Sequence, residues 1–158
     1  MINKILPGVL AVVLIGTITW MVNSGKEESS DVVNKDKIVA TIHKSPYCGC
    51  CGKYGEYVED LNYSVDVVLE DDMDIVKKEF SVPYELESCH TMEVGGYIVE
   101  GHIPNEAVEK LLSEKPDIKG IGMSGMPSGS PGMPGPKEEF LIYEINNDGT
   151  KGGLYIEL

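Results

Sequence analysis

The sequence contains no arginine, and each of its 13 basic residues is a lysine. Arginine supplies the planar, forked guanidinium group that binds a phosphate or a guanine through paired hydrogen bonds. Aspartate and glutamate together number 26, which gives a formal net charge of −13 at pH 7. Nucleic acid is therefore an unfavourable partner, whereas cations are attracted to such a surface.

Long uncharged stretches are also scarce, and residues 5–22 form the notable one, ILPGVLAVVLIGTITWMV. Its length is just sufficient to cross the hydrocarbon core of a bilayer. Lys4 and the amino terminus precede it, and positive ends stay in the cytoplasm. We therefore expect residues 1–22 to be a single-pass transmembrane anchor in the cell membrane, with the C-terminal domain extracytoplasmic. A cleaved signal peptide is the alternative, although its apolar region usually has about 7 to 15 residues.

The remainder divides into a polar segment and one domain. Residues 23–37 are rich in Ser, Lys, Glu and Asp and have little to bury, which indicates a flexible linker. Residues 38–158 alternate β-branched runs with helical periodicity. The expected strands are 38–43, 65–70 and two within 91–101, and the expected helices are 52–60, 73–80 and 105–115. This order predicts an α/β fold in which a mixed sheet is covered by flanking helices.

The end of the chain has a different character. Residues 116–136 are rich in Gly, Pro and Met without an apolar period, so we expect a long loop. The segments 140–145 and 153–158 flank an Asn-Asn-Asp-Gly-Thr turn and predict a terminal β-hairpin.

Cysteine is limited to four residues, and three of them, Cys48, Cys50 and Cys51, share one turn at a strand-to-helix junction. A helix amino terminus stabilises a thiolate, so these residues should be good nucleophiles or metal ligands. Structural disulfides are the alternative, since they persist in exported proteins. Three thiols within one turn nevertheless close very little chain, so such bridges would stabilise the fold only weakly.

The fourth cysteine, Cys89, is followed directly by His90. If the next strand pairs beside the first one, both sulfur-bearing segments meet at one end of the sheet. Thiolates select Cu(I), zinc or iron–sulfur chemistry. Cu(I) is favoured because two or three thiolates satisfy it, whereas a zinc site generally uses two well-spaced pairs. The predicted ligands are Cys48 and Cys51 as the principal pair, supported by Cys50, Cys89 and His90, with Cys89 preferred over His90.

Three segments carry a family resemblance: HKSPYCGCC, ESCHTMEVGGYIVEGHIP and GMPSGSPGM. They resemble the metal-binding family catalogued as domain of unknown function 411, over about residues 38–140. The resemblance implies a thioredoxin-like fold, an exported protein linked to copper handling, and a loop at residues 88–91 lying against the Cys-x-x-Cys turn. This sequence departs from the family at Tyr54, where relatives commonly have Trp, and at Met123-Ser-Gly-Met126, where an apolar-Pro-Gly-Met sequence is more usual.

Other candidate ligands remain open. Met123, Met126 and Met133 are either weak, exchangeable Cu(I) ligands or packing residues over the site. His102 either faces the cluster or caps the following helix, and the direction of His43 cannot be read from the sequence. Tyr47 is expected to shield the thiols.

Three functions are compatible with this pattern. The leading hypothesis is a membrane-tethered Cu(I)-binding protein, not an enzyme, that sequesters copper or exchanges it with a donor or acceptor protein. The alternative is a thiol–disulfide oxidoreductase in which Cys48 attacks and Cys51 resolves. The third is an interaction module in which the disulfides have no role beyond stabilising the fold.

Overall fold

A computed structural model describes residues 37–158 of the chain. The predicted anchor, residues 1–22, and all of the predicted linker except its last residue lie outside the described residues. Within the described part, every helix falls short of the length and hydropathy that a membrane crossing requires.

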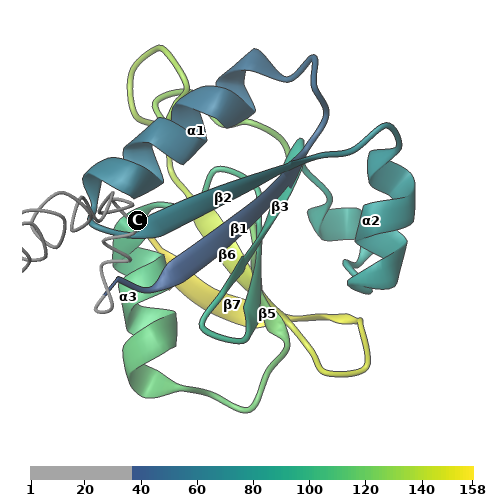
Figure 1. Cartoon of the computed structure of the whole chain (residues 1–158). Coiled ribbons are helices and arrows are strands. Elements are labelled where there is room, and N and C mark those ends of the chain that lie inside the picture. Colours follow the sequence, from purple (N-terminus) through teal and green to yellow (C-terminus); the bar gives the residue numbers. More distant parts are fainter. Residues whose placement is uncertain (1–36) are drawn as a thin grey trace, which may run out of the picture. The chain divides into compact units, whose positions relative to one another are not determined.

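The described chain forms seven strands, three α-helices and one short 3-10 helix (Figure 1). In chain order these are β1 Val39–Lys44, α1 Gly49–Asp60, β2 Ser64–Leu69, α2 Met73–Glu79, η1 Tyr84–Leu86, β3 His90–Val94, β4 Tyr97–Glu100, α3 Asn105–Glu114, β5 Gly120–Gly122, β6 Leu141–Ile145 and β7 Lys151–Glu157. One sheet contains all strands in the order β2-β1-β3-β4-β5-β6-β7. The pairs β1/β2 and β4/β5 are parallel and the others antiparallel, so the predicted mixed α/β sheet is confirmed.

Both faces of the sheet are covered by helices. Helices α1 and α3 pack on one face, where Tyr54 and Leu111 join the larger buried apolar cluster (Figure 1). Helix α2 and η1 cover the other face, where Leu86 and Ile98 belong to a smaller cluster. Each strand therefore sends alternate side chains to different environments, and this alternation decides which residues face the sulfur-bearing turn.

Helix α1 begins earlier than predicted. The sequence placed its start near Gly52, but Cys48 already has the extended conformation of an N-cap residue and the helix begins at Gly49. The cause is that the Ser45 carbonyl accepts a hydrogen bond from the Cys48 N–H at 3.1 Å, which turns the chain into the helix. Cys50 and Cys51 consequently lie inside its first turn.

The predicted loop at residues 116–136 contains a short buried strand, β5. Its sequence, Gly-Ile-Gly, is too short for an alternating pattern, so periodicity missed it. Gly120 is required there because a Cβ would lie 1.8 Å from the carbonyl oxygen of Ile98 on β4. The rest of the segment is a loop, and the terminal hairpin of β6 and β7 is confirmed.

The strand pairing that brings the cysteine segments together is present. Strand β3 pairs antiparallel with β1, and Lys44 at the end of β1 lies opposite His90 at the start of β3. The turn after β1 carries the three clustered cysteines, and the segment before β3 carries Cys89. The two segments therefore meet at one end of the sheet, as the sequence predicted.

Candidate metal centre

The cysteine-bearing turn places its sulfur atoms at the amino end of α1. Cys48 and Cys51 form a disulfide, with Cα atoms 5.4 Å apart. The thiol of Cys50 is free, and its Sγ lies 3.5 Å from Cys48 Sγ. Cys51 is fully buried and its Sγ lies 3.6 Å from the carbonyl oxygen of Cys89. The two sulfur-bearing segments are thus in direct contact.

A buried carboxylate holds the segment that carries Cys89. Glu100 on β4 accepts hydrogen bonds from the Ser88 backbone N–H at 2.6 Å and from the Thr91 hydroxyl at 2.6 Å. Lys77 on α2 donates to the same carboxylate at 2.5 Å, and both charged side chains are almost wholly buried. Burial raises the pKa of Glu100, while Lys77 opposes that rise. Glu100 therefore fixes the residues on both sides of Cys89 and His90.

His102 directs a lone pair at Cys89. Its Nδ1 lies 2.6 Å from the Pro131 carbonyl oxygen, which can only accept, so Nδ1 carries the proton. Its Nε2 is then the unprotonated nitrogen, and it lies 3.1 Å from Cys89 Sγ. A carbonyl that fixes the tautomer in this way is the usual outer-shell partner of a metal-binding histidine.

His90 is buried beside the same sulfur. Its Nδ1 lies 3.6 Å from Cys89 Sγ, and its Nε2 has no hydrogen-bond partner among the described residues. Burial lowers the pKa of His90 well below its ordinary value, and the neighbouring charges of His102, Lys77 and Lys44 lower it further. Burial also lowers the pKa of His102. Both imidazoles are therefore neutral at pH 7, which is the form that binds metals.

Tyr54 packs against both imidazoles from α1. Its ring centroid lies 4.5 Å from that of His90 and 5.4 Å from that of His102. Its hydroxyl donates to the Ile103 carbonyl at 3.0 Å, which joins α1 to the chain after β4. Burial raises the pKa of Tyr54 far above its ordinary value, so the residue acts as a neutral wall.

Two overlapping groups of potential ligands result. In each group the ligand atoms all lie within 4.8 Å of one another. One group contains Cys48, Cys50, Cys51 and Cys89, and the other contains Cys51, Cys89, His90 and His102. All five predicted ligands are thus brought together, and their role as ligands stays a prediction. His102, which the sequence left open, belongs to the second group.

The loop after β5 closes one side of the cluster. Gly132 has φ +79° and lies so close to α1 that a Cβ would be 2.9 Å from the Tyr54 nitrogen. Figure 1 shows this loop beside α1. Met126 Sδ lies 3.9 Å from Cys50 Sγ, whereas Met123 is buried in the main core and Met133 is half-buried. Of the three methionines, Met126 is therefore the one that contacts a cluster sulfur.

Two residues near the cysteines in sequence do not take part in the cluster. His43 points to the face covered by α2, where its ring nitrogens lie 2.9 Å from Glu70 and 3.0 Å from Glu93. Tyr47 was expected to shield the thiols, but 94% of its surface is exposed. That interpretation is wrong, because the turn directs the Tyr47 side chain to solvent.

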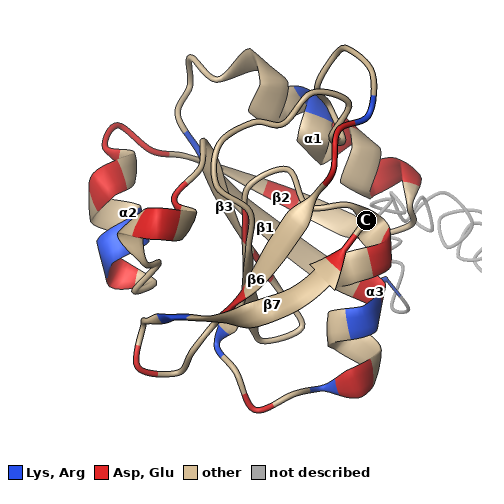
Figure 2. Cartoon of the chain, turned by 180° about the vertical axis from the view of Figure 1, so that it is seen from behind, with Lys and Arg blue, Asp and Glu red and all other residues tan. Residues whose placement is uncertain are grey.

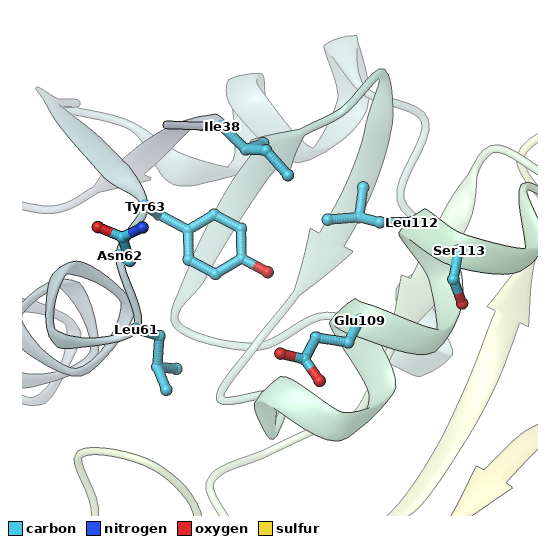
Figure 3. Close-up of a pocket in the computed structure, with 7 residues that line it drawn as sticks. All are labelled: Ile38, Leu61, Asn62, Tyr63, Glu109, Leu112 and Ser113. Carbon is cyan, nitrogen blue, oxygen red and sulfur yellow. The ribbon is translucent and has the colours of Figure 1, made fainter. Parts of the chain in front are cut away.

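An open hollow of about 680 Å³ adjoins the cluster, and Cys89 and Met126 line it together with Asp74, Glu85 and Glu87. Figure 2 shows further acidic residues on α1, α2 and α3. A separate hollow of about 400 Å³ lies at the opposite end of β1, where Ile38, Tyr63 and Leu112 surround it without any cysteine or histidine (Figure 3). Of these two hollows, the acidic one is therefore the one that gives access to a cluster sulfur, that of Cys89.

The donor set suits a soft metal ion. Thiolate sulfur and neutral imidazole nitrogen favour Cu(I) or zinc over hard cations such as magnesium and calcium. Nε2 of His90 has no hydrogen-bond partner among the described residues, and the lone pair of His102 Nε2 faces the thiol of Cys89. Burial raises the pKa of Cys89 to about 11, so a proton must leave this thiol when a metal binds.

Comparisons with known proteins give a family model and two solved structures. A family model described as "Protein of unknown function, DUF411" matches residues 86–133. Two solved structures of a copper resistance protein, copG, are each 32% identical to this chain over 78% of its length. The chain covers 99% of Form 2 with a TM-score of 0.72, and 98% of Form 1 with a TM-score of 0.71. No match was found among curated proteins.

Proposed function

The chain belongs to the DUF411 family, and we propose on that premise that it is an exported, membrane-tethered Cu(I)-binding protein that sequesters copper or passes it on. The observation that supports the proposal most strongly is the meeting of Cys51, Cys89 and His102 within 4.8 Å. These residues come from three separate segments of the chain. A hydrophobic core does not need sulfur and imidazole side chains from separate segments to meet, whereas a site for a soft metal ion does.

Cu(I) fits the site better than zinc. Cu(I) accepts two or three soft ligands, and both ligand groups offer overlapping sets from which such a number can be chosen. A structural zinc site generally takes four ligands from well-spaced pairs, whereas Cys50 and Cys51 are adjacent, as are Cys89 and His90. The acidic hollow that leads to Cys89 attracts cations.

Copper binding by the principal pair requires reduction. Cys48 and Cys51 are joined in the structure, and a disulfide sulfur is a poor ligand. A dithiol reductant would break the S–S bond, become a disulfide itself and leave two thiols, which release their protons to solvent when the metal binds. The oxidised protein still offers Cys50, Cys89 and the two imidazoles.

The proposed membrane tethering is supported by residues 5–22, whose length and flanking charge fit a single crossing that leaves the following chain outside the cytoplasm. We assign the described domain to the thioredoxin-like class because α1, with Cys48 as its N-cap residue, follows a short turn after β1 and the Cys89 segment lies against it. A partner that donates or accepts copper would reach the thiols through the hollow lined by Cys89 and Met126.

A competition titration tests the proposal. The reduced protein is titrated anaerobically with Cu(I) against a coloured Cu(I) chelator, beside Cys48→Ser, Cys51→Ser and the oxidised wild type. We expect affinity to fall at least about 10-fold in each variant, because one thiolate ligand is lost. Unchanged affinity in both variants would remove the principal pair from the site, and an absence of binding by the wild type would remove the proposed function.

A second candidate function, thiol–disulfide exchange, is favoured by the disulfide at the start of α1. A substrate thiolate would attack Cys48 Sγ, form a mixed disulfide and release Cys51 as the thiolate. A second substrate thiolate would then displace Cys48 and leave as the substrate disulfide. Cys50 Sγ, 3.5 Å from Cys48 Sγ, opposes this function because it would compete for the mixed disulfide.

Insulin reduction by the metal-free protein separates the two functions. A copper-binding protein should reduce insulin no faster than the free dithiol alone, and Cys50→Ser should not change that. A rate well above the free dithiol, abolished by Cys48→Ser, would favour the oxidoreductase.

A further inference from the structure

Lys44, the last residue of β1, is largely buried and has no acidic partner within residues 37–158. Only 8% of its surface is exposed, although lysine is almost never fully buried unless it is paired. Its Nζ donates a hydrogen bond to the Ser45 carbonyl at 3.0 Å. None of the ion pairs within residues 37–158 includes it.

Lys77, the other buried lysine of the described residues, has the carboxylate partner that Lys44 does not have there. Lys77, with 4% of its surface exposed, lies 2.5 Å from the buried carboxylate of Glu100. Removing an ammonium group from water without a counter-ion is unfavourable. Lys77 has Glu100 as its counter-ion, whereas Lys44 has no counter-ion among the described residues.

Lys44 is next to both sulfur-bearing segments, the turn that carries Cys48 and the start of β3. The Ser45 carbonyl that accepts from its Nζ also accepts from the Cys48 N–H at 3.1 Å, so the two nitrogens are no more than about 6 Å apart. On the other side, Lys44 lies opposite His90 in the β1–β3 register. Directly opposite residues project to the same face of a sheet, so the side chains of Lys44 and His90 share the face covered by α1.

The charge of Lys44 also reaches the cluster. It is among the charges that lower the pKa of His90. The amino end of α1 adds partial positive charge from its unpaired N–H groups at the same place. Lys44 and the helix terminus therefore place positive charge beside the cluster before any thiol ionises.

We propose that Lys44 is the counter-ion of the metal-loaded cluster, compensating the excess negative charge of the cysteine thiolates that hold copper. The proposal rests on the proposed function and identifies a residue outside the ligand set. One Cu(I) ion neutralises one thiolate, and every further thiolate ligand leaves a negative charge in a buried place. The ammonium of Lys44 supplies the compensation, so the cluster and Lys44 stabilise each other only when metal is bound.

The expected size follows from Coulomb's law. Two unit charges separated by a distance on the order of 7 Å, at an effective dielectric constant of about 20, interact strongly enough to change a binding constant about 50-fold. Lys44→Met keeps the apolar stem and removes the charge, and Lys44→Gln keeps a donor for the Ser45 carbonyl. Both should weaken Cu(I) binding about 50-fold, and Lys44→Arg should restore most of it.

The test is an anaerobic Cu(I) competition titration of the full reduced protein, with the melting temperature of the metal-free form as the second readout. Lys53→Met is the matched control, since Lys53 is exposed on α1 two residues after Cys51. It should change the affinity less than about 2-fold. Metal-free Lys44→Met should melt at or above the wild-type temperature, because an unpaired buried charge is gone.

The outcomes separate the two proposals. Wild-type binding together with unchanged affinity in Lys44→Met and Lys44→Gln overturns the role of Lys44 and leaves the proposed function intact. A lower melting temperature in the metal-free variants, with affinity that Lys44→Arg does not restore, assigns Lys44 a purely structural role and also overturns it. A wild type that binds no Cu(I) ends both proposals.

Discussion

Glu100→Ala should cost the protein about 4 kcal/mol or more of unfolding free energy. The substitution leaves the Lys77 ammonium, 4% exposed, without its partner, and breaking a buried ion pair from one side costs about 3 to 5 kcal/mol. It also leaves the Ser88 N–H and the Thr91 hydroxyl without their acceptor, at about 1 to 3 kcal/mol for each donor that water does not reach. The whole domain has only about 5 to 15 kcal/mol to lose.

Urea denaturation followed by far-ultraviolet circular dichroism measures this loss. In a separate thermal denaturation, the melting temperature of Glu100→Ala should be about 10 to 15 °C below that of the wild type, as expected for a domain of this size. Glu93→Ala is the matched control, since Glu93 is half exposed and its contact with His43 is worth at most about 1 kcal/mol. The double variant Lys77→Met/Glu100→Leu removes both charges and should recover most of the lost stability. A loss below about 1 kcal/mol in Glu100→Ala would refute the inference that this carboxylate organises the Cys89 segment.

Three further expectations concern the walls of the site. Gly132→Ala should lower the melting temperature of the protein and weaken Cu(I) binding, because a Cβ 2.9 Å from the Tyr54 nitrogen displaces the loop that holds His102; equal binding would contradict this. Tyr54→Phe should cost about 1 kcal/mol, the value of a typical hydrogen bond, in urea denaturation, and a neutral result would show that the bond to Ile103 is replaced by water. As pH falls below about 6.5, the unfolding free energy of the metal-free protein should decrease by up to about 1.4 kcal/mol per pH unit for each buried imidazole. The reason is that His90 and His102 bind protons in the unfolded chain at a pH at which they stay neutral in the folded protein. Urea titrations between pH 7 and pH 5.5 should show a smaller slope in His90→Gln, and an unchanged slope would contradict the lowered pKa of His90.

The sequence predicted the parts of the fold that periodicity marks. Alternation over residues 38–43 and the spacing of apolar residues in 105–115 identified a strand and a helix that the structure contains. The short strand β5 was missed because three residues carry no period, and only the contact of Gly120 with Ile98 identifies it. The early start of α1 was missed because a cysteine is an unusual N-cap residue.

The candidate site could be predicted only where sequence neighbours shared it. Three cysteines in one turn and a Cys-His pair are visible in the sequence. The direction of His102 depends on the Pro131 carbonyl 29 residues away, so no local pattern indicated it. The burial of Lys44 was equally invisible, because a lysine at the end of a strand is usually solvated. Long-range contacts decide both residues.

Shared binding of one metal by sulfur and imidazole from separate segments is the central claim. X-ray absorption at the copper edge, measured on the anaerobically loaded protein, reports the atoms that surround the ion. We predict a mixed shell of sulfur and imidazole nitrogen, with the sulfur contribution reduced in Cys89→Ser and the imidazole contribution reduced in His102→Gln. A spectrum that neither substitution alters would place copper on the cysteine turn alone and contradict the claim.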